Sequence, residues 1–389
     1  MNAVNIISTM LNLVSACVFD DNPKLIWHSI SIEDQCEVLS LADKCGYRSI
    51  LYYYLKDEFP KEFSRECKLD FISLAAKSIQ REKAIGEIQQ IFKENQIDFT
   101  FVKGAFTAIN FYPSPALRYS SDIDLLVKNS DSIRAFTIAK AHGWKPIHEF
   151  FELNKQHFPS QIKKHVFLEI HTFLFGTIKE ENQELWSELK KYNYNSELCL
   201  LHILHHALRH HNFLNITKAI LDVGFILKTK TINWEYFRYL EKKFLCSGLL
   251  DFLLNSFPEF FSRSGIIPQK PIPKSLQNSL KNVVLGTYPT NQFDFLVSDF
   301  SNKNMKSKIK TLLTLIASLK PAFFALKYNI PIFRAYWLYP FYFCNEILKK
   351  TQKYFTIKYS LKHQEGDTIN NLHMEAEIYK FLDQQNHSS

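Results

Sequence analysis

Three carboxylates suited to metal binding, together with a histidine, stand in two short apolar runs of the sequence. Asp122 and Asp124 are separated by one isoleucine, and so are Glu169 and His171. Successive side chains of a β-strand alternate between its two faces, so each pair is expected to project from one face of its strand. Two such strands side by side would bring three carboxylates to one surface.

A cluster of carboxylates of this kind predicts a site for divalent cations. Two carboxylates about 4 Å apart repel by roughly 4 kcal/mol at an effective dielectric of 20, and a cation removes that cost. Hard oxygen ligands suit Mg²⁺ or Mn²⁺, and two ions about 3.5 to 4 Å apart can activate a hydroxyl while neutralising a triphosphate. The chemistry indicated is phosphoryl or nucleotidyl transfer. Taken alone, a D-x-D pair is more often an exposed strand end without a metal, so the third carboxylate carries this interpretation.

A lysine and a glycine, Lys103 and Gly104, follow the β-type run 99–102 and precede a short segment of helical spacing. A helix beginning there would offer phosphates its free backbone N–H groups, its dipole and the lysine. Alternatively, Gly104 supplies a tight turn and Lys103 is a surface residue, as in most Lys-Gly pairs. The position of the pair one strand before Asp122 supports the phosphate interpretation.

Three histidines, His202, His206 and His210, recur every four residues and are expected on one helical face. Zinc is not favoured there, because no nearby cysteine or carboxylate completes a tetrahedral set and the glutamate of an H-E-x-x-H motif is missing. We expect this face to be half buried against the predicted sheet. His206, together with His171 and Asp222, is a candidate to shape the pocket of an acceptor substrate.

The periodicity of apolar residues predicts the elements that position these side chains. Strands are predicted at 99–102, 122–127, 144–151 and 165–174, and helices at 105–111 and from Asp131, as the cap, to about His142, before Gly143. Residues 185–260 return to helical spacing, with one stripe formed by Leu198, Leu201, Leu204 and Leu208.

The chain therefore divides into five predicted regions. They are a helical region at 1–95, a small α/β unit at 96–175, a helical domain at 176–262, a proline-containing connection at 263–303 and a basic, aromatic helical region at 304–389. The last region has lysines and aromatic residues that could bind a membrane surface or single-stranded nucleic acid. Helix packing, with aromatic residues in a core and solvated lysines opposite, is the commoner arrangement and the one that we favour.

Composition narrows the class of protein further. The 389 residues include 34 phenylalanines and only 10 glycines, which favours aromatic-packed helices over glycine-loop dinucleotide folds. The 7 cysteines are scattered singly, which argues against a disulfide framework and indicates a cytoplasmic protein with reduced thiols. No apolar run is long enough to predict a transmembrane segment. The net charge of +8 is mild for this length, so nucleic acid is a partner that we do not favour.

Several short motifs occur in an order that resembles a known family. They are Phe-Val-Lys-Gly-Ala at 101–105, Tyr-Pro at 112–113, Leu-Arg at 117–118, Ser-Asp-Ile-Asp-Leu-Leu-Val at 121–127 and Leu-Glu-Ile-His at 168–171. Together they resemble the poorly characterised bacterial nucleotidyltransferase family with a Lys-Gly pair in its first loop, a branch of the DNA-polymerase-β-like superfamily. The resemblance extends through the histidine-rich segment and Asp222 and covers about residues 80–245. Each motif is common by itself, whereas the ordered set is not.

The resemblance implies an α+β fold, in which a small mixed β-sheet palm is flanked by N-terminal helices and a larger C-terminal helical region. It implies that Asp122 and Asp124 are metal ligands for Mg²⁺ or Mn²⁺ in a two-metal site, with Glu169 as the third carboxylate. Arg118 and Ser121 would line the pocket of a nucleoside triphosphate. The superfamily's usual glycine-serine pair is here Lys103-Gly104, so the role of the serine hydroxyl does not carry over and the lysine is its candidate substitute.

The implied activity is transfer of a nucleoside monophosphate to an unidentified acceptor with release of pyrophosphate. In this reaction, Glu169 would bind metal or act as general base, and Lys103 and Arg118 would steady the charge of the leaving pyrophosphate. Two alternatives use the same pocket. One is a catalytically silent module that binds nucleotide or docks a partner, and the other is transfer of a different phosphoryl unit to a peptide or metabolite.

Overall fold

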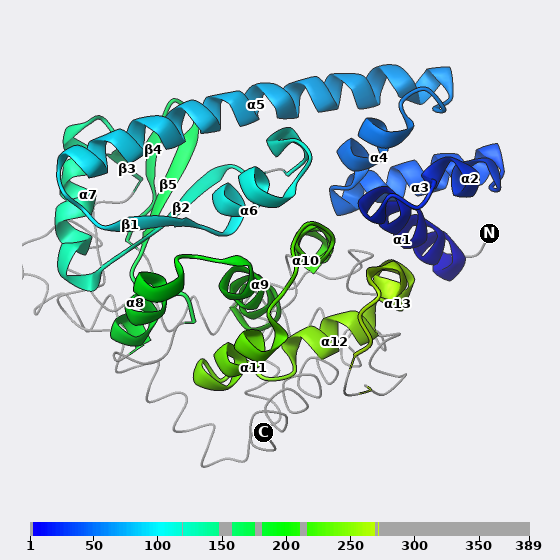
Figure 1. Ribbon diagram of the computed structural model, residues 1–389. Coiled ribbons are helices and arrows are strands. Elements are labelled where there is room, and N and C mark those ends of the chain that lie inside the picture. The colour runs from blue at the N-terminus through cyan, green and yellow to red at the C-terminus, as the bar shows by residue number, and fades with distance from the viewer. Residues whose placement is uncertain are drawn as a thin grey trace, which may run out of the picture. The chain divides into compact units, whose positions relative to one another are not determined.

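The structure, a computed structural model, describes residues 3–118, 120–147, 158–175, 181–210, 216–268 and 271 (Figure 1). The described elements all belong to one compact unit. The predicted helical region at 304–389 and most of the connection at 263–303 lie outside the described residues. No helix in the described ranges combines the length and the apolar character needed to cross a membrane.

Four short helices open the chain. They are α1 (Ala3–Phe19), α2 (Pro23–His28), α3 (Ile32–Cys45) and α4 (Arg48–Leu55). The sequence sets the ends of α3, because the Ser31 side chain accepts a hydrogen bond from the backbone of Asp34 and Gly46 adopts the left-handed conformation at φ 76°. The predicted helical character of this region is confirmed.

The next helix, α5 (Lys61–Glu94), has 34 residues and is therefore about 51 Å long. The C-terminal part of α5 lies along one face of the sheet, together with α7 (Ser132–Ala141) (Figure 1). Buried side chains of both helices pack there against the inward side chains of the strands, among them Ile88, Phe92 and Phe136. This layer of apolar side chains holds the sheet in place from one side.

The sheet has five strands in the order β1-β2-β5-β4-β3. The strands are β1 (Phe99–Val102), β2 (Asp122–Val127), β3 (Lys145–Pro146), β4 (Gln161–Lys163) and β5 (Val166–His171). Strands β2 and β5 are parallel, and the other pairs are antiparallel. The mixed sheet and its helices confirm the α+β class predicted from the sequence.

A group of helices, the helical layer, follows the sheet and lies on the side of the molecule away from α5 (Figure 1). It contains α8 (Glu181–Tyr192), α9 (Ser196–His205), α10 (Ile216–Thr229), α11 (Trp234–Lys243), α12 (Leu249–Ser256) and α13 (Pro258–Phe261), and α9 continues into a π-helical turn, His206–His210. Helices α9 and α10 pack against the helix Lys103–Phe111 (α6). The predicted leucine stripe is confirmed, since the side chains of Leu198, Leu201, Leu204 and Leu208 are all buried.

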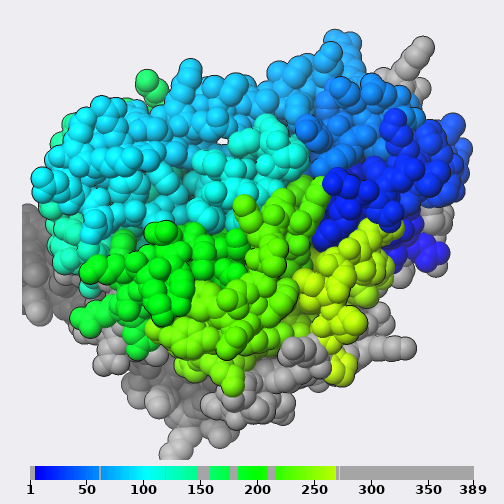
Figure 2. Space-filling view, in the orientation of Figure 1, coloured from blue at the N-terminus to red at the C-terminus, as the bar shows by residue number. Residues whose placement is uncertain are grey.

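The two ends of the described chain pack on each other. Helix α1 contacts α3, α10 and α13, and the Ser15 hydroxyl donates a hydrogen bond to the backbone oxygen of Phe260. Figure 2 shows the N-terminal residues in blue beside the yellow-green residues near the end of the described chain. The N-terminal helices are therefore part of the same unit as the sheet and the helical layer.

Some elements differ in detail from the sequence expectations. Strand β4 is missed by the sequence pattern because its three residues have no apolar alternation. The helix expected from Ala105 begins two residues earlier, at Lys103, and is α6 (Lys103–Phe111). Asp131 stands at the N-cap of α7, but its side chain makes no capping hydrogen bond. Of the strand predicted at 144–151, β3 is the part that lies within the described residues.

Candidate active site

The carboxylates of β2 and β5 lie on the sheet face opposite α5. Ile123 and Leu125 point into the apolar layer under α5, so the alternation of the strand turns Asp122 and Asp124 to the other face. Because β2 and β5 are parallel, with Asp124 paired to Glu169, the third carboxylate projects beside the first two. The predicted convergence of the strands is therefore what the structure contains.

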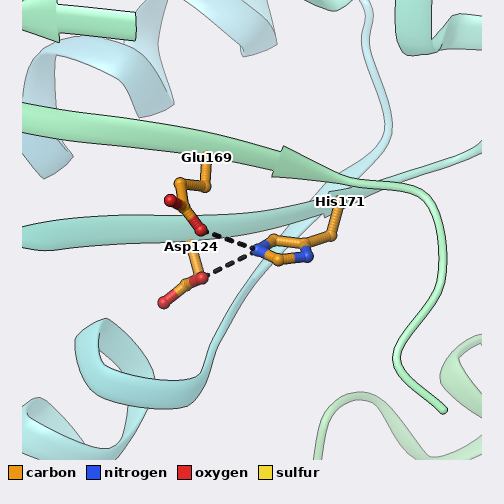
Figure 3. A group of neighbouring side chains, drawn as sticks. All are labelled: Asp124, Glu169 and His171. Carbon is orange, nitrogen blue, oxygen red and sulfur yellow. Dashed lines mark hydrogen bonds and ion pairs between the residues drawn. The ribbon is translucent and has the colours of Figure 1, made fainter. Parts of the chain in front are cut away.

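Asp124, Glu169 and His171 form the tightest group of candidate ligands (Figure 3). One ligand atom of each lies within 4.8 Å of the others. His171 Nε2 is 2.8 Å from Asp124 Oδ1 and 3.6 Å from Glu169 Oε2. Asp124 and His171 are buried, whereas Glu169 is half-buried and accepts a hydrogen bond of 2.9 Å from Ser160 Oγ. Glu169 is thus the more exposed of the two carboxylates in the group.

Asp122 is the neighbour of this group rather than one of its three closest members. Its Oδ1 accepts a hydrogen bond from Ser120 Oγ. Burial and the charge of Asp124 raise the pKa of Asp122, while the hydrogen bond from Ser120 opposes the shift. Glu169 adds to the repulsion. Asp122 therefore feels two other carboxylates and would gain from a cation placed between them.

Lys103 brings a positive charge to the same place. Its Nζ lies 2.9 Å from Asp124 Oδ1 and 3.4 Å from His171 Nε2. Burial alone would raise the pKa of Asp124, but Lys103 and His171 outweigh it and hold that pKa well below its usual range. The backbone of Lys103 has φ 48°, a left-handed conformation that is uncommon for lysine. Such strain is often found at functional sites.

Position 104 requires a glycine because Arg118 and Ser120 pack directly against it. A Cβ at Gly104 would overlap Arg118 Nη1 and lie 2.8 Å from Ser120 Oγ. Both groups therefore approach the first turn of α6 closely. Gly104 permits the loop before β2 to rest on the N-terminus of α6, which puts a guanidinium beside the free N–H groups of that helix.

Arg118 is fixed from the helical layer. Its Nε and Nη2 donate hydrogen bonds of 2.9 and 2.8 Å to the two carboxylate oxygens of Asp222 on α10. The Tyr112 hydroxyl donates a third bond, of 2.7 Å, to Asp222 Oδ1. Asp222 was predicted to border an acceptor pocket; both of its oxygens are directed at Arg118 and Tyr112.

The remaining predicted residues differ in how deeply they are buried. Ser121 is exposed at the beginning of β2, and the neighbouring Ser120 is the serine that contacts Asp122. His206 lies in the π-helical turn, with its ring 6.1 Å from that of the buried His202. Tyr194 joins the buried group, since its hydroxyl lies 2.9 Å from His202 Nδ1.

Two basic residues near the site escape the motif analysis. Arg81 on α5 donates hydrogen bonds to the backbone oxygens of Pro115, Arg118 and Ser120, so it fixes the loop before β2. Lys218, whose side chain is exposed, precedes Asp222 by one turn of α10, and partial desolvation of its ammonium together with the nearby charge of Arg118 lowers its pKa. The spacing of Lys218 and Asp222 was the signal available in the sequence, but it gains meaning only when Asp222 is known to face the site.

The donor set fits a divalent cation. The three clustered ligand atoms are close enough to bind one ion, and the Lys103 ammonium beside Asp124 shows that this position accommodates positive charge. Two carboxylates and an imidazole suit Mn²⁺, and adding Asp122 increases the share of hard oxygen ligands that Mg²⁺ prefers. The predicted site and the observed cluster thus share Asp124 and Glu169, with His171 as an addition.

Comparison with known proteins adds one finding. The chain matches the family described as uncharacterised nucleotidyltransferase over residues 32–261. The matched region begins with α3, includes the whole sheet and ends with α13, so it extends beyond the range of about 80–245 expected from the motifs. No curated protein and no solved structure matches the chain. Since the match covers more than half of the sequence and includes every carboxylate of the site, the chain belongs to this family of uncharacterised nucleotidyltransferases.

Proposed function

We propose that the protein moves a nucleoside monophosphate from a nucleoside triphosphate to an acceptor and releases pyrophosphate, with divalent cations bound at the carboxylates. The observation that carries the proposal is the convergence of Asp122, Asp124 and Glu169 beside Lys103 at the beginning of α6. Ligands for cations and donors for phosphates are thereby combined in one site. Membership of a nucleotidyltransferase family supports the same type of reaction.

Asp122, Asp124 and Glu169 would hold Mg²⁺ or Mn²⁺, with His171 as a further ligand. When bound, the cations would polarise the phosphates and neutralise part of the triphosphate charge. The protein's own contribution is to hold the carboxylates on neighbouring parallel strands, so that little reorganisation is needed when substrate binds.

Lys103, Gly104, Arg118 and Ser121 are the proposed contacts of the nucleotide. The N-terminus of α6 offers backbone N–H groups and the positive end of a dipole to phosphate oxygens. Arg118 lies against that turn. Negative charge that develops on the leaving pyrophosphate would therefore be stabilised by the side chains of Lys103 and Arg118, which are already in position. Stabilisation of this developing charge accelerates the reaction most.

The transfer itself breaks one bond and forms one. An acceptor oxygen attacks the α-phosphorus, the bond from that phosphorus to the oxygen bridging to the β-phosphate breaks, and pyrophosphate leaves. Glu169 is our candidate to take the proton of an acceptor hydroxyl, because it is half-buried and its Oε1 is oriented by Ser160. His171 and His206 are proposed to border the acceptor, whether that is a small molecule, a peptide or a protein.

Two other functions fit the same fold and remain as alternatives. A silent module would bind nucleotide without turnover, and a different phosphotransferase would move the γ-phosphoryl group instead of the nucleotidyl group. The clustered carboxylates favour catalysis over the silent module, since repelling charges are seldom kept together without a cation.

The test is to incubate purified protein with each nucleoside triphosphate, labelled in parallel at the α- and the γ-phosphate, with Mg²⁺ or Mn²⁺ and a cell extract. Transfer of α-label with formation of pyrophosphate supports the proposal, and transfer of γ-label alone replaces it with the other phosphotransferase. Asp122→Asn and Asp124→Asn should abolish transfer, whereas Asp57→Asn, at an exposed position after α4, should not. Binding of nucleotide without transfer of either label would leave the silent module.

A further inference from the structure

The helical layer brings a second basic residue to the start of α6. Lys218 and Asp222 are four residues apart on α10 and therefore lie on the same side of that helix, one turn apart. Asp222 binds Arg118, and α10 packs against α6. Lys218 is thus placed on the side of α10 that faces the Arg118 guanidinium and the first turn of α6.

Arg118 is held so that one end of its guanidinium faces that turn. Nε and Nη2 are occupied by Asp222, whereas Nη1 lies over Gly104 and makes no hydrogen bond within the described residues. The two N–H groups of Nη1 are therefore donors without a protein acceptor in the part of the chain that the structure describes. A planar guanidinium held at one end by a carboxylate is well suited to bind phosphate oxygens at the other.

The two positive charges of Lys218 and Arg118 favour binding of an anion beside them. The Lys218 side chain is exposed as a whole, but partial desolvation of its ammonium lowers its pKa, and the nearby Arg118 guanidinium lowers it further. Asp122 and Asp222 oppose this shift. Asp222 already neutralises Arg118, and Asp122 belongs to the carboxylate cluster. A polyphosphate bound beside both cations would relieve their repulsion while it met the N–H groups of α6.

We infer that Lys218 and Arg118 Nη1 form a binding site, between α10 and the first turn of α6, for the terminal phosphates of a nucleoside triphosphate. This inference rests on the proposed function and names which end of the substrate the helical layer holds. The leaving pyrophosphate lies at this site, while the α-phosphate lies nearer to the carboxylates of β2 and β5. Asp222 and Tyr112 act through Arg118 as positioning residues. Residues from both the loop before β2 and the helical layer would then be needed to hold the leaving group.

The test measures binding of the full chain to inorganic tripolyphosphate and, separately, to a nucleoside monophosphate by titration calorimetry in Mg²⁺. Loss of one charge-assisted hydrogen bond should weaken tripolyphosphate binding about tenfold or more in Lys218→Met and leave monophosphate binding within about twofold. Lys218→Arg should retain most of the affinity for tripolyphosphate. Lys230→Met, exposed just beyond the same helix, is the matched control and should bind as wild type does.

Wild-type affinity for tripolyphosphate in Lys218→Met, or an equal loss of affinity for both ligands, would overturn the inference, as would absence of tripolyphosphate binding by the wild type. If Lys218→Met does not fold, Lys218→Gln takes its place, with thermal unfolding as the check. The two proposals can fail independently. If the protein transfers no α-label but Lys218→Met still loses affinity for tripolyphosphate alone, the proposed function is wrong and the phosphate site remains. If the protein transfers α-label but Lys218→Met binds tripolyphosphate as tightly as wild type does, the proposed phosphate site is absent.

Discussion

Asp222 on α10 and Arg118 before β2 form a bidentate ion pair, with hydrogen bonds of 2.9 and 2.8 Å between residues 104 positions apart in the sequence. Their side chains are only 3% and 12% exposed. The pair joins the helical layer to the loop that rests on α6. Because both charges are withdrawn from water, the loss of one partner leaves the other buried and uncompensated.

Replacing Asp222 with alanine should therefore destabilise the protein by about 3 to 5 kcal/mol, as measured by urea unfolding followed by circular dichroism. The double variant Arg118→Met/Asp222→Leu should recover part of that loss, because it leaves no unpaired buried charge. The control is Asp98→Ala, which breaks an exposed pair with Lys128 and should cost less than about 1 kcal/mol. Equal effects of Asp222→Ala and Asp98→Ala would show that the buried pair does not couple the two layers.

Gly104→Ala should impair nucleotide binding by moving Arg118. The added Cβ overlaps Nη1 of Arg118 and crowds Ser120 Oγ, so the loop before β2 must shift away from α6. We expect at least a tenfold loss of affinity for nucleoside triphosphate, equivalent to about 1.4 kcal/mol. Gly86→Ala on α5 is the matched control, since a Cβ there meets nothing within 4 Å and should stabilise the helix by roughly 0.5 to 1 kcal/mol. Unchanged nucleotide affinity in Gly104→Ala would contradict a phosphate site at this turn.

Replacing each aspartate of β2 with asparagine should change the stability of the metal-free protein in opposite directions. The folded pKa of Asp124 is depressed, so its charge stabilises the fold above the unfolded pKa of about 3.9, and this contribution is lost as the pH falls through the folded pKa. The folded pKa of Asp122 is raised, so its charge costs stability at neutral pH, and that cost disappears as the pH falls below the unfolded value.

Near neutral pH with a chelator, Asp124→Asn should therefore lower the free energy of unfolding by about 1 to 3 kcal/mol, since Lys103 loses its charged partner. Asp122→Asn should raise it. The effect of Asp122→Asn should shrink as the pH falls from the raised folded pKa of Asp122 to the unfolded value of about 3.9. The effect of Asp124→Asn should shrink only below that value, as the pH approaches the depressed folded pKa of Asp124. Urea unfolding at several pH values measures the effect. Destabilisation by both variants to the same extent would indicate that the repulsion at Asp122 is already neutralised in the metal-free fold.

The sequence was sufficient for the carboxylates because their placement depends on local geometry. Two residues separated by one apolar residue in a strand must share a face, and this alternation predicted the grouping of Asp122 with Asp124 and of Glu169 with His171. The structure pairs β2 with β5 in parallel and thereby aligns Asp124 with Glu169, a pairing that the alternation within each strand does not predict. Local spacing could not predict which of these side chains lie closest to one another. His171 is one of the three that do.

The contacts across the layers could not be derived in this way. Nothing near Arg118 in the sequence indicates that Asp222 will be its partner, because that contact depends on how α10 packs on α6. The same packing decides the location of Lys218. Ser120 rather than Ser121 contacts Asp122, and a choice between adjacent serines depends on the turn before β2, which has no regular period to guide it.

Lys103 should compete with the metal that its neighbours bind. Its ammonium lies 2.9 Å from Asp124 Oδ1, so a divalent cation at Asp124 must bind against this positive charge or displace it. Lys103→Met should consequently bind Mn²⁺ several-fold more tightly, as measured by electron paramagnetic resonance of free Mn²⁺. Nucleotidyl transfer should fall in the same variant, because the lysine ammonium no longer stabilises the phosphates. Lys83→Met, exposed on α5, controls for the loss of one positive charge and should change neither quantity. Tighter metal binding combined with slower transfer would separate the two roles of Lys103, whereas weaker Mn²⁺ binding in Lys103→Met would mean that the lysine supports the carboxylate cluster instead of competing for it.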